Sequence, residues 1–358
     1  MKSRSGHLNR IHGLSLVELM VALTIGLIIL TAVSSLFVSS KQTYNTQDSL
    51  ARLQENARFA MQFMIKDLRL AGYFGCLYHV DSLDMQTNAD GSVQGSNFKI
   101  DLNGGTAFNN NAFIPFEGVE NAAGSWKPSG SALPSGIKAG TDAIAVRLAD
   151  VSNSANIAPG MLNGSSNLVV DDASPFSAGD IVVVSDCAGG DLLQISGIAG
   201  NTLQHATGGS PGNATSSLLK AYAPPAKVFK TTTRIYFVKQ QTNGVPVLYR
   251  QDNGGSAEPL VEGVENLQIL YGEDTDSPSD GVPNIYRKAT AVTNWAKVVS
   301  VRIGILMRTL DDKNTDIDNG KYDVDGDGTY ELNAPGDRYR RRIFQAVIQV
   351  RNVWPWSS

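Results

Sequence analysis

The chain has 358 residues, of which 42% are hydrophobic and 18% are charged, and its formal net charge is −4. Ordinary soluble domains carry about 25% charged residues, so this chain is poor in charge but apolar enough to bury a large core, which excludes a disordered or fibrous protein. The net charge leaves no basic surplus to neutralise phosphates, and we therefore expect no nucleic-acid partner.

Glycine is unevenly distributed along the chain. Of the 35 glycines, only these lie in the first 75 residues: Gly6, Gly13, Gly26, Gly72 and Gly75. A glycine-poor segment favours continuous helix, whereas a remainder rich in glycine, asparagine, serine and threonine favours short strands joined by turns. We therefore predict an α+β fold, in which one long N-terminal helix is followed by a β-rich globular head.

Residues 14–38 form the most apolar segment of the chain, and Glu18 is their only charged residue. As a helix, residues 19–38 would span about 30 Å, which matches the hydrocarbon thickness of a bilayer. Residues 1–13 contain three basic side chains and no acid, so the positive-inside tendency places everything after residue 38 across the membrane. We predict a transmembrane helix over residues 14–38. A cleaved secretory signal and a plain signal anchor are the alternatives.

The motif GLSLVEL, residues 13–19, begins the apolar segment directly after the basic residues. This arrangement resembles the class III signal of type IV prepilins. The resemblance implies that a prepilin peptidase cleaves between Gly13 and Leu14, that residues 1–13 are a leader, and that the new amine of Leu14 is methylated. Leu14 departs from the phenylalanine that the family more often has at this position.

Glu18 places a charge inside a membrane segment, which costs about 2.5–3.5 kcal/mol on insertion scales and so requires a partner or a function. Leu14 and Glu18 are four residues apart and share one helix face, so the carboxylate lies close in depth to a new N-terminal amine. In the resembling family this glutamate pairs with the amine of a neighbouring subunit, which implies that Glu18 sets the register between subunits. The alternative is a glutamate that reaches up to the membrane surface.

Residues 39–71 continue the predicted helix with a different pattern. Their apolar residues recur at spacings of three and four: Leu50, Leu53, Ala57, Met61, Met64, Leu68 and Ala71. This stripe is typical of an amphipathic helix with one face in a core. Gly72 and Gly75 follow it as a helix stop. We predict that residues 39–71 pack on the head, which comprises residues 72–358.

Alternating apolar segments predict the strands of the head. They are residues 142–148, 167–171, 180–186, 192–198, 234–239, 245–250, 264–271, 298–308 and 343–351. The pair Asn243-Gly244 predicts a hairpin, and Pro246 indicates an edge position for the strand that follows. We expect residues 298–308 to have one buried and one solvated face. Residues 81–140 are expected to form long loops with one short hairpin, and residues 274–283 and 311–337 are expected to form loops.

Several segments of the head resemble one family, the PilW minor pilins of bacterial type IV pili. They are AGYFGC (71–76), GTDAIAVRLAD (140–150), GDIVVVSDC (179–187), LVEGVENLQILYGEDTD (260–276), VVSVRIGILMRT (298–309) and RRRIFQAVIQVRN (340–352). The resemblance implies a pilin-like single-pass protein of the bacterial inner membrane with a periplasmic C-terminal domain, which after assembly lies at the tip or in the shaft of the pilus.

The implied partners are other minor pilins, the major pilin, the prepilin peptidase, the inner-membrane assembly platform and a tip adhesin. The implied role is to prime pilus assembly, and thereby to support twitching motility and cell adhesion. Such a subunit acts by association and not by catalysis. The chain has no nucleophile elbow, phosphate loop or HExxH motif, and we predict that it is not an enzyme.

Two other functions stay open. A GspJ-like pseudopilin of a type II secretion system shares the leader and the architecture. A signal-anchored periplasmic enzyme or binding domain could carry a prepilin-like start by coincidence. The PilW-like segments near the C-terminus favour the minor pilin over the first of these, and the absence of a catalytic motif argues against an enzyme.

Cys76 and Cys187 are the two cysteines of the chain, and each lies in a segment that resembles the family. With the predicted topology both lie on the oxidising side of the membrane. A disulfide between them would stabilise the head by about 4–5 kcal/mol in the chain-entropy treatment. Two buried free thiols are the alternative.

Residues 323–328, DVDGDG, place Asp323, Asp325 and Asp327 at positions 1, 3 and 5 of an EF-hand-type calcium loop, with glycine at position 6. Position 12 is Ala334, so the usual bidentate glutamate is absent. Four nearby acids could complete a different set of oxygen ligands: Asp316, Asp318, Glu331 and Asp337. Calcium is therefore the one cofactor that we consider, and a solvated acidic turn is the alternative.

A basic cluster precedes the last predicted strand and consists of Arg338, Arg340, Arg341 and Arg342. Charged side chains at a strand edge protect it from pairing with other chains. We expect these arginines to protect the edge and to pair with the acidic loop that precedes them.

Overall fold

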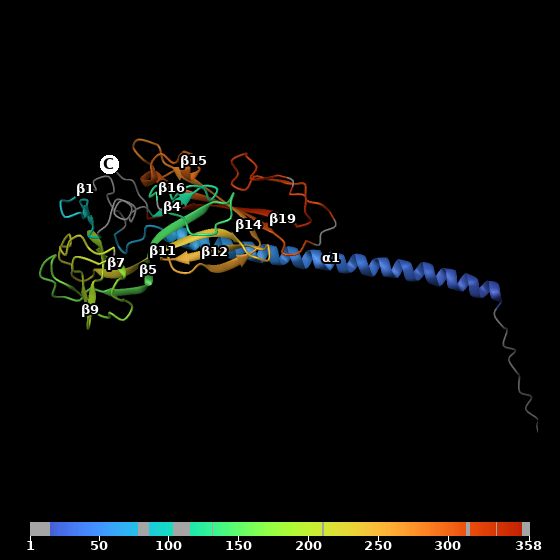
Figure 1. The fold of residues 1–358 in the computed structure, drawn as a ribbon, viewed down its shortest axis with the longest axis horizontal. Helices are drawn as coiled ribbons and strands as arrows, with labels where there is room; N and C mark the ends of the chain where they lie inside the picture. The colour runs from blue at the N-terminus through green and yellow to red at the C-terminus, as the bar shows by residue number, and fades with distance from the viewer. Residues whose placement is uncertain are drawn as a thin grey trace, which may run out of the picture. The chain divides into compact units, whose positions relative to one another are not determined.

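The computed structural model describes residues 15–77, 86–102, 115–130, 132–209, 211–312, 316–333 and 335–352. The chain divides into two units, Met1–Arg52 and Leu53–Ser358. The boundary falls inside helix α1 (Leu16–Leu70), which is drawn in blue in Figure 1. The expected fold class is confirmed, because one long helix with an apolar N-terminal half is followed by a strand-rich head.

In the first unit, the described part of α1 runs from residue 16 to residue 52. Its apolar side chains are exposed along the whole segment from Leu16 to Val38. A helix that is apolar on every face is unfavourable in water. Residues 16–38 of α1 therefore require lipid or other helices around them.

The second unit begins with the C-terminal half of α1, which has one buried face. The buried helical residues repeat at helical spacing: Leu53, Ala57, Ala60, Met61, Met64, Asp67 and Leu68. Every residue of the apolar stripe expected from the sequence is buried except Leu50, which is half-buried. The packed part of the helix therefore begins at Leu53 and not at residue 39, because residues 39–49 are mostly polar and carry no apolar stripe.

The strands of the first part of the head are β1 (Gln86–Thr87), β2 (Val93–Gln94), β3 (Phe98–Ile100), β4 (Phe116–Val119), β5 (Ala143–Asn156), β6 (Leu168–Val169), β7 (Ile181–Asp186), β8 (Gly189–Gln194), β9 (Gly197–Ala199) and β10 (Thr202–Gln204). The later strands are β11 (Lys227–Gln240), β12 (Pro246–Asp252), β13 (Glu258–Glu262), β14 (Val264–Glu273), β15 (Ile285–Arg287), β16 (Val298–Arg308), β17 (Lys321–Tyr322), β18 (Leu332–Asn333) and β19 (Arg341–Gln349). Two short 3-10 helices, η1 (Ala289–Ala291) and η2 (Trp295–Lys297), precede β16.

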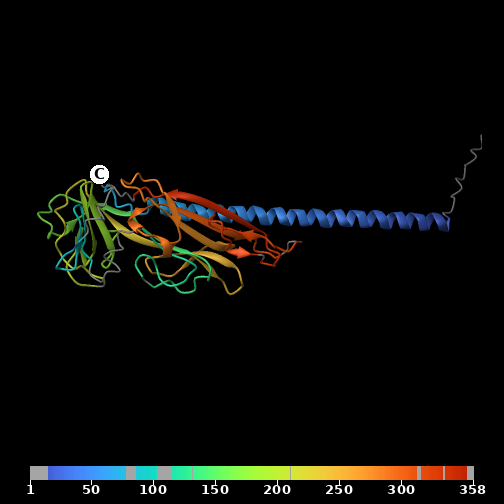
Figure 2. The same ribbon diagram turned by 90° about the horizontal axis from the view of Figure 1, so that it is seen from above.

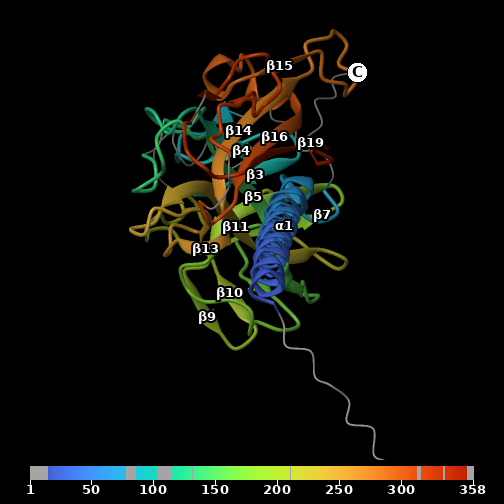
Figure 3. The ribbon, with the colours of Figure 1, turned by 90° about the vertical axis from the view of Figure 1, so that its right-hand side faces the viewer.

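These strands form four sheets within the described residues. A ten-stranded sheet has the order β1-β2-β3-β8-β7-β11-β12-β13, with β5 beside β11 and β4 beside β5. The others are a four-stranded sheet β15-β14-β16-β19, a three-stranded sheet β6-β10-β9 and the pair β17-β18. Pairing between the named strands is antiparallel except between β3 and β8. Figures 1 and 3 place the four-stranded sheet at one end of the head and β9 at the other.

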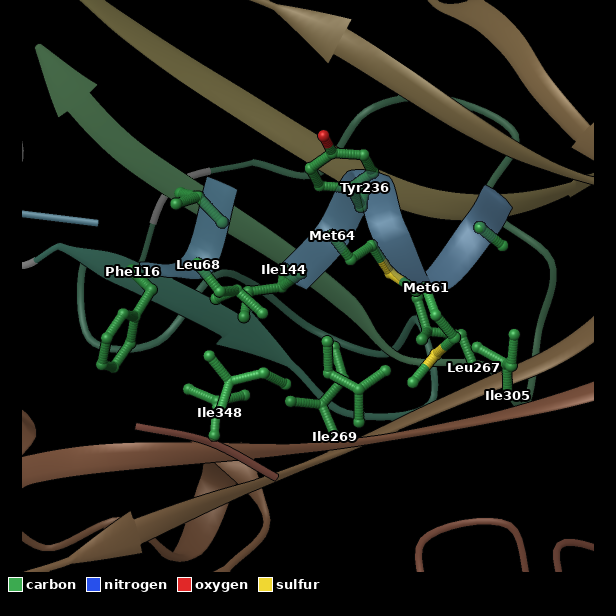
Figure 4. Close-up of a cluster of buried hydrophobic side chains, with 14 of the residues drawn as sticks. Met61, Met64, Leu68, Phe116, Ile144, Tyr236, Leu267, Ile269, Ile305 and Ile348 are labelled. Carbon is green, nitrogen blue, oxygen red and sulfur yellow. The ribbon is translucent and has the colours of Figure 1, made fainter. Parts of the chain in front are cut away.

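The main core lies where the helix meets two sheets. Met61, Met64 and Leu68 of α1 lie between strands of the ten-stranded sheet and the strands β14, β16 and β19, as Figure 4 shows. The strands of the four-stranded sheet run alongside this half of the helix (Figure 2). Each large apolar side chain buried here stabilises the fold by about 1.5–3 kcal/mol, so the part of α1 from Leu53 onward is an integral part of the head.

The β11–β12 hairpin confirms one local prediction and corrects another. The strands pair from Arg234–Asp252 to Gln240–Pro246, and Gly244 in the turn has a φ of 81°, a conformation that favours glycine. The edge position expected from Pro246 is wrong, because β12 lies between β11 and β13. Proline is tolerated there because it is the first residue of its strand.

Strand β16 differs from the expected half-solvated strand, because almost all of its residues are buried on both faces. The loop after β16 covers the second face, and the carbonyl of Val324 contacts the backbone of Gly304 so closely that a Cβ there would lie 1.8 Å from its oxygen. Gln345 of β19 donates a hydrogen bond to the same carbonyl at 2.9 Å. The apolar alternation of β16 could not predict this cover, because the covering residue, Val324, lies outside the strand.

Candidate assembly segment and acidic loop

Glu18 lies in the first turn of α1 and is exposed. Its Oε2 accepts a hydrogen bond from the backbone N–H of Ser15 at 3.0 Å, and Ser15 Oγ accepts one from the N–H of Glu18 at 3.2 Å. This reciprocal pair is a capping box, which satisfies two N–H groups at the start of the helix. Glu18 therefore has a role within its own chain that the sequence analysis missed, although the S-x-x-E spacing is its usual signature.

Three side-chain hydroxyls in the apolar part of α1 are satisfied by its own backbone. Thr24, Thr31 and Ser35 donate to the carbonyls of residues one turn earlier, at 2.8–2.9 Å. Such internal bonds suit a helix in lipid, where an unsatisfied polar group is costly. By length and composition α1 qualifies as a membrane-crossing helix. Gly13 and Leu14, the predicted cleavage and methylation residues, lie outside the described residues.

A disulfide joins Cys76, just after α1, to Cys187 in the turn between β7 and β8, with a Cα–Cα distance of 4.8 Å. Beside it, Ser185 Oγ donates to the carbonyl of Phe74 at 2.6 Å. Gly75 has a φ of +81°, and a Cβ there would lie 2.7 Å from the ring of Phe229. The end of the helix is thus fixed to β7 and β11 by a covalent bond, a hydrogen bond and a close contact.

The acidic loop, residues 323–331, lies between β17 and β18. The carboxylates of Asp323, Asp325 and Asp327 each offer an oxygen within 4.8 Å of the others. Asp323 accepts the N–H groups of Gly326 and Gly328 at 2.7 and 3.0 Å, and Glu331 Oε2 accepts the N–H of Val324 at 2.7 Å. The loop therefore brings the three predicted ligands together, with a fourth carboxylate beside them.

Asp325 is the most unusual member of the loop because it is fully buried. Its Oδ1 accepts the N–H of Asp327 at 3.0 Å, but its Oδ2 has no hydrogen-bond partner. Burial, followed by repulsion from Glu331 and then Asp327, raises the pKa of Asp325 to about 6. Lys288 Nζ lies 3.8 Å from Asp325 Oδ2 and 3.3 Å from Asp327 Oδ2. Lys288 is therefore a cation close to the buried carboxylate of Asp325.

Arg341 connects β19 to the region that contains the acidic loop. Its guanidinium binds Asp337 at 2.6 Å, Asp318 at 2.9 Å and Glu265 of β14 at 2.5 Å. The expected pairing of the basic cluster with acids before the last strand is confirmed for this arginine. Because the side chain is 1% exposed, the network is structural and holds the segment against the sheet.

A second group of buried charges was not predicted from the sequence. Lys99 Nζ lies 3.0 Å from Asp101 Oδ1, and Asp191 accepts hydrogen bonds from the hydroxyl of Tyr222 and from the N–H of Leu219. Burial and, after it, repulsion from the nearby Asp191 raise the pKa of Asp101 to about 9. This direction favours the neutral form of Asp101, which lowers the cost of burying it.

Two family profiles match this chain. The profile described as "Prokaryotic N-terminal methylation motif" matches residues 8–34, and the profile described as "Type IV Pilus-assembly protein W" (PilW) matches residues 235–352. The first match covers the start of α1 with Glu18. The second extends from β11 to β19 and includes the four-stranded sheet and the acidic loop.

The methylation motif and the apolar helix that follows it support a pilin class for this protein. The match in the head covers about a third of the chain and makes this part similar to PilW minor pilins. A comparison with curated proteins finds no match. Among solved structures, the Type IV-like pilin TTHA1219 from Thermus thermophilus is similar at 15% identity, with a TM-score of 0.24, over 49% of this chain and 85% of that chain. This overlap is too weak to support any inference.

Proposed function

We propose that this protein primes the assembly of a type IV pilus as a processed minor pilin. A prepilin peptidase removes residues 1–13, Leu14 becomes the N-methylated first residue, and α1 holds the protein in the inner membrane with its head in the periplasm. The observation that carries the proposal is the exposed apolar half of α1, which begins with a single carboxylate and is followed by a head with the PilW domain.

Glu18 has two roles in this proposal. In the membrane-anchored monomer its carboxylate caps its own helix through the N–H of Ser15. During assembly the carboxylate exchanges this neutral donor for the charged amine of a neighbouring subunit, because a charge-assisted hydrogen bond is roughly twice as strong as a neutral one. The head then selects the other minor pilins, the major pilin and a tip adhesin by surface contacts, without catalysis. Piliation, twitching motility and adhesion depend on this assembly.

Deletion of the gene is expected to reduce surface pili strongly while type II secretion continues. Surface pili are quantified by shearing and immunoblotting, and secretion is measured by the activity of a secreted enzyme in the same cultures. The wild-type gene is expected to restore pili. Lost secretion with intact pili would contradict the proposal and favour a GspJ-like pseudopilin.

Complementation with variants separates the two roles of Glu18. Glu18→Ala removes both the cap and the assembly carboxylate, and we expect it to fail to restore pili. Ser15→Ala is the matched control, because it weakens the cap but keeps the carboxylate, and we expect it to restore them. Equal loss of pili in both variants, at equal protein level, would show that Glu18 acts only as a cap.

A further inference from the structure

The acidic loop offers a set of hard oxygen ligands in a short stretch of chain. Asp323, Asp325 and Asp327 converge at positions 1, 3 and 5, and Gly328 at position 6 has a φ of +92°. The loop also holds Glu331 at position 9, a position that often contributes through water in EF-hand loops. Calcium prefers carboxylate and carbonyl oxygens in a flexible arrangement of six to eight ligands, which such a loop supplies.

Convergent acids alone do not make a metal site, and the buried Asp325 provides independent support. The side chain is 1% exposed, and its Oδ2 has no hydrogen-bond donor. A buried carboxylate oxygen without a donor is costly unless a cation lies beside it. The oxygen faces Asp327, whose own Oδ2 shares the same cation, Lys288. The position between these two carboxylates is therefore a cation position.

Lys288 fills this position poorly. Its Nζ lies 3.3 and 3.8 Å from the two carboxylate oxygens, whereas a charge-assisted N–H···O bond is usually about 2.7–2.9 Å long. Lys288 follows β15 of the four-stranded sheet, whereas the loop connects β17 and β18 of a separate sheet, so the lysine side chain can move away without disturbing the backbone of the loop. One ammonium also balances only part of the charge of four neighbouring carboxylates.

We propose that residues 323–331 form a calcium site, in which Asp323, Asp325, Asp327 and Glu331 are ligands and calcium displaces the ammonium of Lys288. Val324, inside the loop, is bonded through its carbonyl to Gln345 of β19 and lies against Gly304 of β16. Calcium would therefore stiffen the loop that covers the four-stranded sheet, within the region that matches the PilW profile. Magnesium is a poorer fit because it demands near-ideal octahedral geometry and keeps its waters.

The test uses the full-length protein in detergent after treatment with a chelator. Calcium titration by calorimetry is expected to give saturable binding, and the melting temperature is expected to rise with calcium more than with an equal concentration of magnesium. The decisive variant is Lys288→Gln, which removes the competing charge and should tighten calcium binding by about tenfold or more. A gain in affinity cannot result from misfolding.

Two further variants locate the site. Asp325→Asn is expected to abolish the calcium response while far-ultraviolet circular dichroism remains that of the wild type. Asp276→Asn is the matched control, because Asp276 belongs to a second acidic group, with Asp274 and Asp280, and its Oδ2 already accepts a hydrogen bond from Asn284 at 3.0 Å. The proposal would be overturned if neither the wild type nor Lys288→Gln bound calcium. It would also be overturned if Asp276→Asn lost the calcium response while Asp325→Asn kept it.

Discussion

Replacing both Cys76 and Cys187 with serine is expected to lower the free energy of unfolding of the head by about 4–5 kcal/mol, because the disulfide closes a loop of 111 residues in the unfolded chain. The loss should be large because this bond fixes the end of the packed helix to the β7–β8 turn. Urea unfolding of the full-length protein in detergent, followed by tryptophan fluorescence, measures the change as a shift of the midpoint.

The control for this prediction is the wild-type protein with the disulfide reduced, which should unfold at the same midpoint as the double serine variant. A thiol count on denatured, unreduced protein purified from membranes should give no free cysteine. Two free thiols in that count, or a serine variant as stable as the wild type, would contradict the disulfide.

Asp67→Asn is expected to destabilise the head by about 3–5 kcal/mol, the usual cost of breaking a buried ion pair by removing one partner. Asp67 lies on the buried face of α1, and its carboxylate accepts hydrogen bonds from Arg234 Nη1 at 2.8 Å and from the hydroxyl of Tyr236 at 2.5 Å. Both partners belong to β11, so this contact joins the helix to the centre of the ten-stranded sheet. The measurement is the same urea midpoint.

Asp48→Asn provides the matched control, because Asp48 pairs with Arg52 on an exposed part of the same helix. A surface pair of this kind contributes at most about 0.5 kcal/mol, so the midpoint should barely move. If the two asparagine variants had equal midpoints, the buried contact between Asp67 and β11 would not stabilise the head.

The helix could be predicted from the sequence because its signals are local. The apolar run that begins the helix and the three–four spacing from Leu53 to Leu68 each depend only on neighbouring residues. The long strands β5, β14, β16 and β19 could be located for the same reason. The short strands β1, β2 and β3 could not, because two or three residues show no periodicity and their pairing depends on β8.

Features that depend on distant contacts could not be predicted. Pro246 indicated an edge strand, but β13 pairs with the other side of β12. The residues of β12 alone do not indicate this second partner strand. The strand pattern around Gly304 also does not indicate that Val324 packs directly against this glycine. The role of a strand glycine or proline is thus determined by the neighbour that the fold brings to it.

For the candidate site, the sequence identified the acids but not their surroundings. Asp323, Asp325 and Asp327 were predicted as a group from their spacing, yet the burial of Asp325 and the approach of Lys288 depend on tertiary contacts. The capping box of Ser15 and Glu18 could be predicted from the S-x-x-E spacing alone, because it depends only on neighbouring residues.

The N-terminal peptide of the protein recovered from membranes of piliated cells tests the central claim most directly. Mass spectrometry should find a chain that begins at Leu14 with a methylated amine, and Gly13→Ala should accumulate the uncleaved precursor. A wild-type chain that still begins at Met1, one cut near residue 34 by a secretory signal peptidase, or normal maturation of Gly13→Ala would contradict a processed pilin.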